Sequence, residues 1–353
     1  MNGPLSLRVG LGTEFLSPGP VPVGHSFLFM ATSTNSRPRA AKARIGNSAA
    51  IDSAADARDS AEKNPAAPAA PVSAALSAIE RVRLARNPSR PQTLDYVEHL
   101  VRDFFEIHGD RRFADDGAIV AGMGYFGRRA VAIVGHQRGR STQERIRRNF
   151  GKPHPEGYRK AARMYDLASR MGLPLITFID TQGAEPGLGA EERGQAEAIA
   201  ANLELMMRLE VPVIACVIGE GGSGGALALG VANVVLMQEN ACYSVITPEG
   251  CAAILWREGG PERVADAAAA LKLSAPDLLR LGVADEVVPE PPGGAHQDPP
   301  RAARELGRAI ERQFVRLSRL SPIRLRRERE KKFAAMGSAF VSARRVENQR
   351  PLG

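Results

Sequence analysis

The sequence contains no apolar run approaching the roughly 18 residues of a membrane span, although 44% of its 353 residues are hydrophobic. A transmembrane segment is therefore not expected, and the chain is long enough to bury one large core. Cysteine is scarce: Cys216, Cys242 and Cys251 lie in or beside apolar segments without CxxC spacing. They predict reduced core residues in a cytosol-like compartment, with no disulfide framework and no zinc site on this chain.

Acidic residues are too few to balance the basic ones, and the formal net charge is +8. The excess is concentrated between Arg301 and Lys332. A basic face suits nucleic acid, an acidic partner or ligand phosphates, and the simplest interpretation is a solvated basic helix. Nucleic-acid binding is therefore not expected; the rival hypothesis requires salt-sensitive binding that depends on Arg324 to Lys332.

Residues 1–72 show no sustained period of 2 or 3.6, and the first 50 residues contain a single acid, Glu14. This bias predicts a disordered leader, either a transit-like segment or the product of an upstream start with Met30 as the true first residue. We expect one domain over residues 73–337, with C-terminal helices at about 300–336, and a disordered tail over residues 338–353.

Hydrophobic periodicity predicts strands that alternate with helices through this domain. Helices are expected at 72–84, 94–107 with Thr93 as N-cap, 158–171, 195–209, 226–231, 249–256 after Pro248, 262–281 and, broken at Pro322, 300–333. Strands are expected at 118–125 and 130–136, which form a hairpin, and at 173–180, 212–218, 233–237, 243–246 and 283–288.

Two consecutive units share one plan, in which a buried strand leads through a glycine-rich segment into a helix. The strand at 173–180 is followed by TQGAEPGLGAEERG, and the strand at 212–218 is followed by GEGGSGG. Because the carboxyl ends of adjacent parallel strands meet at one edge of a sheet, both segments should face a common site. The amides exposed at a helix N-terminus would favour negative charge there.

Three functional interpretations of residues 219–225 are open. Gly219, Gly221 and Gly224 satisfy the dinucleotide pattern GxGxxG, and Glu239 lies about 20 residues further on. Ser223 satisfies the nucleophile-elbow pattern GxSxG, for which His296 and Asp285 are the downstream partners. In the third interpretation the peptide N–H groups form an oxyanion hole, which needs no titratable side chain. A purely structural role, in which the glycines let the following helix pack on the sheet, is the alternative to all three.

Several polar residues beside these segments have both a functional and a structural interpretation. The basic loop after the hairpin is able to clamp phosphates or a carboxylate, or to be simply solvated; its arginines are Arg138, Arg140, Arg145, Arg147 and Arg148. His136 ends a strand and suits a structural role equally well. Glu191 and Glu192 begin a helix, where the macrodipole favours acids, so we do not assign them as an acid/base pair.

From about Ala85 to Gly337 the sequence resembles the carboxyltransferase alpha subunit of the multisubunit acetyl-CoA carboxylase of bacteria and plastids. The agreement is ordered and nearly ungapped, and it includes HGDRRFADDGAIVAGM, GHQRGRSTQERIRRNFGKPHPEGYRKA, LPLITFIDTQGAEPGLGAEERGQAEAIA, VIGEGGSGGALALGVANVVLM and YSVITPEGCAAILW. The resemblance implies an α/β crotonase (ClpP/crotonase-like) fold of repeated ββα units with flanking helices. It also implies an α2β2 heterotetramer with a zinc-containing beta subunit.

The reaction that the resemblance implies is carboxyl transfer from carboxybiotin, tethered to the biotin carboxyl carrier protein, to acetyl-CoA, which gives malonyl-CoA for fatty acid synthesis. ATP would be used by the separate biotin carboxylase subunit, and no metal is expected on this chain. The implied compartment is the cytoplasm, or the plastid stroma if the leader is a transit peptide. A serine hydrolase with Ser223 as nucleophile is the alternative function.

Carried over by position, the resemblance makes Gly224 and Gly225 the oxyanion donors that serve the biotin ureido oxygen. The remaining residues of the implied site are Gly221, Gly222 and Ser223 in the carboxybiotin loop and Gly183, Gly187 and Gly189 in the facing wall. The family loop usually reads TPGAYPG, whereas this chain has Gln182 and Glu185 in place of the proline and the tyrosine. Glu185 is expected to bring a negative charge near an anionic substrate.

Overall fold

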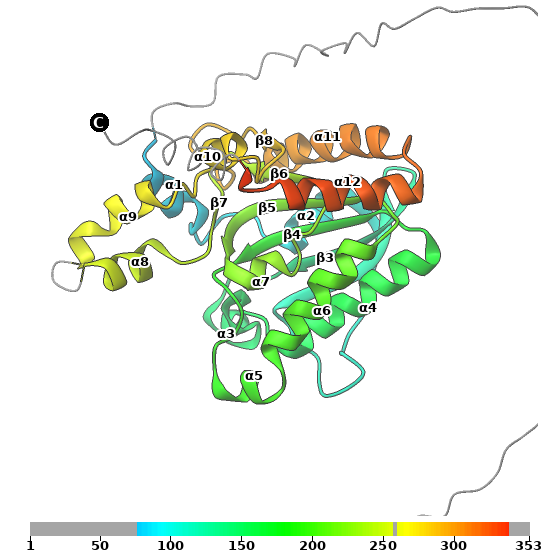
Figure 1. Ribbon diagram of the computed structural model, residues 1–353, viewed down its shortest axis with the longest axis horizontal. Coiled ribbons are helices and arrows are strands. Elements are labelled where there is room, and N and C mark those ends of the chain that lie inside the picture. The colour runs from blue at the N-terminus through cyan, green and yellow to red at the C-terminus, as the bar shows by residue number, and fades with distance from the viewer. Residues whose placement is uncertain (1–75, 257–259, 339–353) are drawn as a thin grey trace, which may run out of the picture. The chain divides into compact units, whose positions relative to one another are not determined.

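The computed structural model describes residues 76–256 and 260–338 (Figure 1). Its strands are β1 Val101–Glu106, β2 Ile119–Phe126, β3 Arg129–His136, β4 Leu175–Thr181, β5 Val213–Gly222, β6 Val234–Gln238, β7 Cys242–Ser244 and β8 Glu286–Val288. Its α-helices are α1 Ala78–Ala85, α2 Thr93–Leu100, α3 Thr142–Arg147, α4 Pro155–Met171, α5 Leu188–Glu192, α6 Gln195–Arg208, α7 Ser223–Leu227, α8 Pro248–Leu255, α9 Val264–Ala270, α10 Ala275–Arg280, α11 Pro299–Leu317 and α12 Pro322–Ala335. Two short 3-10 helices, η1 Asn149–Gly151 and η2 Gly260–Arg263, complete the described elements.

The strands form one eight-stranded sheet in the order β1-β2-β3-β4-β5-β6-β8, with β7 paired to the end of β5. β1, β2 and β3 are antiparallel, whereas β3, β4, β5, β6 and β8 run parallel. All seven residues of β4 are buried, which is typical of a parallel strand covered on both faces. The predicted hairpin of β2 and β3 is confirmed, and its turn consists of Gly127 and Arg128.

Each face of the sheet is covered by its own helices. One core cluster joins α4 and α6 to side chains such as Ile179 and Val217, and Figure 1 shows these helices in front of the sheet. The other cluster joins α2 and α11 to the alternate side chains, including Phe178 and Ile218. Because neighbouring side chains of a strand point to opposite faces, Asp180 and Glu220 lie on the α2 face, beyond Phe178 and Ile218.

The best-predicted helices carry clear end signals. α4 begins with Pro155 at its first turn and ends at Gly172, whose φ of +65° gives the left-handed conformation that suits a C-terminal glycine. α6 covers the range predicted for it to within one residue, and α11 and α12 confirm the helix pair broken at Pro322. α1 begins after a capping box of Ser77 and Glu80.

The predicted helix 94–107 is wrong in its second half. α2 ends at Leu100, and residues 101–106 form β1, which pairs with the outer edge of β2. The N-cap is Gln92, and the hydroxyl of Thr93 instead donates to the carbonyl of His136 at 2.5 Å. Local periodicity favoured a continuous helix here, and the unpaired edge of β2 overrides it.

The glycine segment after residue 218 is also organised differently from the prediction. β5 continues through Gly219, Gly221 and Gly222, because its end pairs with β4 and β7. The helix expected at 226–231 begins earlier, at Ser223, and is a single short turn. The glycines therefore end a strand and begin a helix without an intervening loop.

The remaining expectations have mixed outcomes. The range 262–281 contains η2, α9 and α10 in place of one continuous helix. The expected leader and most of the tail lie outside the described residues, as does the beginning of the helix predicted at 72–84. Among residues 76–256 and 260–338, no helix is both long and apolar enough to cross a membrane.

Candidate active site

The two glycine segments lie side by side, as the sequence predicts. β4 and β5 are parallel neighbours, and Thr181 pairs with Gly221 at their carboxyl ends. A Cβ added at Gly222 would lie 2.1 Å from the carbonyl oxygen of Gln182. Only glycine allows the chain after β4 to approach the end of β5 this closely.

Gly225 makes an equally close approach to the same segment. A Cβ at this position would lie 2.5 Å from the Ala184 nitrogen, 2.7 Å from the Gly183 carbonyl carbon and 2.8 Å from the Tyr158 hydroxyl. Gly183 has a φ of +146°, which side chains rarely tolerate. Gly224 differs, because a Cβ there would meet only the Cγ2 atom of Ile199, at 3.7 Å. We call Gly183 and the facing residues 222–225 the glycine cradle. Within it, Gly225 is tightly packed, whereas Gly224 has room for a side chain.

The amides of Gly224 and Gly225 belong to the first turn of α7. N–H groups in the first turn of a helix have no acceptor within the helix, and the N-cap residue Gly222 has no side chain to supply one. Ser223, which directly precedes Gly224, is exposed and has a φ of +53°. This arrangement presents main-chain donors beside the Gly183 segment, which is what an oxyanion hole requires.

Gly187 and Gly189 lie further along the loop, at the start of α5. Their nearest neighbours come from the same loop: the Glu185 carboxylate beside Gly187 and the Arg193 guanidinium beside Gly189. Glu185 accepts from the Asn149 amide at 2.8 Å and from the Gly187 N–H at 3.0 Å. The hydrogen bond from Asn149 lowers the pKa of Glu185 despite its partial burial. The Glu185 carboxylate therefore connects the glycine-rich loop to the turn at residues 149–152 through these hydrogen bonds.

A network of charges, which sequence reasoning missed, surrounds the strand ends. Asp180 accepts from the Glu220 N–H at 3.1 Å and from the Arg138 guanidinium at 3.2 Å. Glu220 also pairs with Arg86 at 2.7 Å, and Arg86 reaches Glu249 at the start of α8. The charge of Asp180 raises the pKa of Arg138, which keeps this guanidinium ionised. Since the partners are up to 163 residues apart, no local sequence signal predicts the network.

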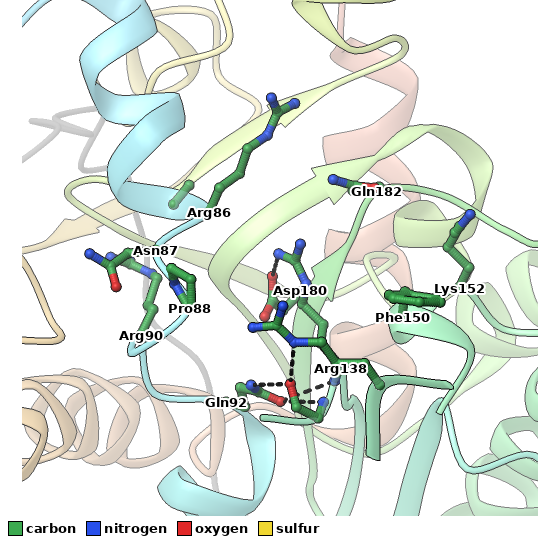
Figure 2. Close-up of a pocket in the computed structure, with 13 residues that line it drawn as sticks. Arg86, Asn87, Pro88, Arg90, Gln92, Arg138, Phe150, Lys152, Asp180 and Gln182 are labelled. Carbon is green, nitrogen blue, oxygen red and sulfur yellow. Dashed lines mark hydrogen bonds and ion pairs between the residues drawn. The ribbon is translucent and has the colours of Figure 1, made fainter. Parts of the chain in front are cut away.

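Two cavities flank the glycine segments on opposite faces of the sheet. The first, of about 310 Å³, is polar and is lined by Asp180, Gln182 and Arg138 together with residues of the α1–α2 connection (Figure 2). The second, of about 380 Å³, is apolar, and Ser223 and Gly224 lie at its wall beside Ile179 and Phe333. Gly224 therefore adjoins an apolar space, where electrostatic interactions are stronger than in water.

The geometry does not assemble a serine-hydrolase triad. His296 hydrogen bonds Gln297, and Asp285 accepts from the Val235 N–H and the Lys332 ammonium. Neither contacts Ser223 in the part of the chain that the structure describes. The dinucleotide interpretation is not supported either, because the first two glycines of its pattern lie inside β5 and not in a strand-to-helix turn.

The basic C-terminal helix is largely neutralised by its own neighbours. Arg324 pairs with Glu328 and Arg326 pairs with Glu330, four residues apart in each case. Arg329 is fully buried and donates to main-chain carbonyls at the end of α6, including those of Met206 and Leu209. The solvated-helix interpretation fits these pairings better than a nucleic-acid surface does.

The three cysteines are free, as predicted, and Cys216 and Cys242 are buried. Burial raises the pKa of both thiols well above the ordinary range. No group of three or more His, Cys, Asp or Glu residues suited to a metal ion occurs in the described ranges.

His136 lies beneath the cradle and gives a testable pH dependence. It is fully buried; its Nδ1 accepts from the Asp180 N–H at 3.4 Å, and its Nε2 has no partner among the described residues. Burial lowers its pKa to about 3. The unfolded chain would take up a proton near pH 6.5, whereas the folded chain would not. The contribution of neutral His136 to the free energy of unfolding is therefore complete above about pH 6.5, and it is lost as the pH falls below this value.

We expect this histidine to remove about 1.4 kcal/mol of unfolding free energy for each pH unit between about 6 and 5. Urea unfolding at several pH values measures this slope, and His136→Gln should flatten it whatever its absolute stability. The pKa of His154 is raised by its hydrogen bond to Asp116, so its contribution to the free energy of unfolding is lost as the pH rises above about 6.5. It therefore does not affect the slope between pH 6 and 5. An unchanged slope in His136→Gln would refute the assignment.

Comparison with known proteins gives the family of the chain. Residues 40–337 match the family described as acetyl co-enzyme A carboxylase carboxyltransferase-like. Relatives named acetyl-coenzyme A carboxylase carboxyl transferase subunit alpha include those of Sorangium cellulosum, 57% identical over 73% of this chain and 81% of the relative, and Aquifex aeolicus, 53% identical over 74% and 81%.

A solved structure of transcarboxylase 12S is similar in fold, with a TM-score of 0.52 and 22% identity. The match covers 64% of this chain and 42% of the transcarboxylase chain, so this chain spans less than half of that protein. The expected α/β crotonase-like fold is confirmed. On the extent of the family match and the identity to its members, the chain belongs to the acetyl co-enzyme A carboxylase carboxyltransferase-like family.

Proposed function

We propose that the chain is the alpha carboxyltransferase subunit of an acetyl-CoA carboxylase, acting in the cytoplasm. Its reaction would transfer the carboxyl group from carboxybiotin, on a separate carrier protein, to acetyl-CoA, which gives malonyl-CoA. The observation that carries the proposal is the position of Gly224 and Gly225 in the first turn of α7, which has no side-chain cap, with Gly225 packed on the Gly183 segment and Gly224 at the wall of an apolar cavity. The family membership supplies the reaction class.

The residues present fit a neutral, planar ureido group that becomes negative during reaction. Biotin supplies the carboxyl group to be transferred. Main-chain N–H groups at Gly224 and Gly225 would hold the developing oxyanion, and losing one such donor typically costs about 3 to 4 kcal/mol of transition-state stabilisation. Gly222 and Gly225 fix these donors through their close packing on residues 182–184. Gly221, Ser223 and, on the facing wall, Gly183, Gly187 and Gly189 complete the proposed binding site.

The site on this chain would be one half of the catalytic centre. We propose that a zinc-containing beta subunit supplies the other half in an α2β2 assembly, and that the biotin carboxylase consumes ATP elsewhere. The purified chain alone should form no malonyl-CoA, and it should gain this activity when the beta subunit and a carboxybiotin carrier are added. Radiolabelled carboxyl transfer measures the gain. Activity of the isolated chain, or inactivity of the complete mixture, would contradict the proposal.

The hydrolase alternative gives a different result at Ser223. A nucleophilic serine would react with a fluorophosphonate probe, and its replacement by alanine would cost several orders of magnitude in kcat. We expect no labelling and a loss well below tenfold in Ser223→Ala, because the proposed donors belong to the following peptides. Labelling of Ser223 together with an inactive variant would favour the hydrolase.

A further inference from the structure

Two tyrosines of α4 contact the two ends of α7. Tyr158 and Tyr165 are seven residues apart, which places them on the same face of the helix, and both are fully buried. The Tyr165 hydroxyl donates to the carbonyl of Ala228, the C-cap residue of α7, at 3.2 Å. The Tyr158 hydroxyl lies at the other end of α7, 2.8 Å from the position that a Cβ of Gly225 would take. Each end of α7 thus rests on a buried phenol of α4.

The two hydroxyls differ in their hydrogen bonding. Unlike that of Tyr165, the Tyr158 hydroxyl has no hydrogen-bond partner among the described residues. An unpaired buried hydroxyl lowers the stability of a protein, and phenylalanine at this position would avoid that cost. Burial raises the pKa of Tyr158 well above its ordinary value, so the hydroxyl keeps its proton. Because no hydrogen bond fixes its torsion, the O–H dipole is free to turn toward a negative charge that develops nearby.

The start of α4 fixes Tyr158 relative to the glycine cradle. The carbonyl of Pro153, just before α4, accepts from the Glu185 N–H at 3.0 Å, which joins this end of the helix to the segment after Gly183. Of the three atoms nearest to a Cβ at Gly225, the Tyr158 hydroxyl oxygen is the only one from a side chain. A polar group that is able to turn therefore lies directly against the residue whose amide is the proposed oxyanion donor.

We propose that Tyr158 is a positioning residue for the oxyanion donor of Gly225, and that its hydroxyl dipole aligns with the Gly225 peptide as negative charge develops at the N–H of that peptide. This inference rests on the proposed function. In a buried environment of low dielectric, a dipole interacts with a charge more strongly than it would in water. The interaction exists only while the charge exists, so it stabilises the transition state and not the bound substrate. An unpaired hydroxyl in the resting enzyme is the consequence of this role.

Kinetics of the complete carboxyltransferase, with the beta subunit and the carboxybiotin carrier, test this role. Tyr158→Phe should lower kcat about tenfold, the effect of losing an interaction as strong as one hydrogen bond. KM for acetyl-CoA and for the carrier should stay unchanged, because the hydroxyl contributes only after charge develops. Tyr165→Phe is the matched control: it removes a buried hydroxyl from the same face of α4, but at the end of α7 that is remote from Gly225. Its kcat should change far less than that of Tyr158→Phe.

Thermal unfolding of the full chain gives a readout that does not depend on turnover. Tyr158→Phe should be at least as stable as the wild type, because it removes a hydroxyl that has no partner. Tyr165→Phe should unfold at a lower temperature, because it leaves the Ala228 carbonyl without its donor. The two variants should therefore separate activity from stability in opposite directions. A purely structural role of the Tyr158 hydroxyl would lower both together.

Three results would overturn the inference. The first is an equal kcat in Tyr158→Phe and the wild type, and the second is a fall in kcat with the same loss of stability as in Tyr165→Phe. The third is a raised KM at unchanged kcat, which would show that the hydroxyl acts on the bound substrate. If the complete wild-type mixture transferred no carboxyl group, the proposed function would fail instead, and unfolding of the two variants would still show whether the Tyr158 hydroxyl lacks a partner.

Discussion

Gly225→Ala is expected to lower the kcat of carboxyl transfer by about 10²- to 10³-fold, the usual cost of losing one oxyanion donor. The added methyl group would lie 2.5 Å from the Ala184 nitrogen and 2.7 Å from the Gly183 carbonyl carbon. These are backbone atoms that no side-chain rotation can move, so α7 and the Gly183 segment must separate. The amide of residue 225 would then be displaced from the position that the oxyanion requires.

Gly224→Ala is the comparison that distinguishes position from mere substitution. Its methyl group would meet only Ile199, at an ordinary contact distance of 3.7 Å, and its φ does not demand glycine. We expect it to keep the unfolding temperature of the wild type and to lose far less activity than Gly225→Ala. Initial rates of malonyl-CoA formation and thermal unfolding of both variants provide the measurement. Equal kcat in Gly225→Ala and the wild type would contradict the proposal that backbone amides stabilise the oxyanion.

The position of the cradle was predictable because both of its strands are strongly marked in the sequence. β4 and β5 are short apolar runs followed by glycine, and parallel strands of this kind bring their carboxyl ends together. The prediction needed no side-chain detail. It placed Gly183 beside the segment that contains Gly222 and Gly225, and the close approaches in the structure bear out this adjacency.

What the sequence could not show depends on distant partners. Residues 101–106 become β1 only because β2 offers them an unpaired edge, and β5 extends to Gly222 only because β4 and β7 pair with it. The same holds for Asp180 and Glu220, whose charges are balanced by Arg138 and Arg86. From the local sequence alone, glycines at the end of a strand predict a turn, and an acid without a nearby basic residue predicts a solvated side chain.

Arg90→Met is expected to lower the unfolding free energy by about 3 to 5 kcal/mol, the cost of leaving a buried charge without its partner. The Arg90 side chain is 3% exposed and its partner Glu290 is 0% exposed; their shortest contact is 2.5 Å. Burial alone would raise the pKa of Glu290, but the Arg90 charge reverses this and lowers it. Arg90 also donates to the carbonyl of Ile218 at 2.6 Å, just before the glycines of β5.

A double variant separates the lost charge pair from the lost packing. Adding Glu290→Gln to Arg90→Met removes the unpaired carboxylate, so part of the stability should return; the Ile218 carbonyl still lacks its donor and limits the recovery. Arg208→Met is the matched control, because Arg208 and Glu204 are both more than 60% exposed and such pairs contribute at most about 1 kcal/mol. Urea unfolding of these three variants and the wild type gives the comparison. If Arg90→Met were no less stable than Arg208→Met, the buried pair would not be what joins the α1–α2 connection to the segment after β8, and the wall that this connection gives to the polar cavity would need another support.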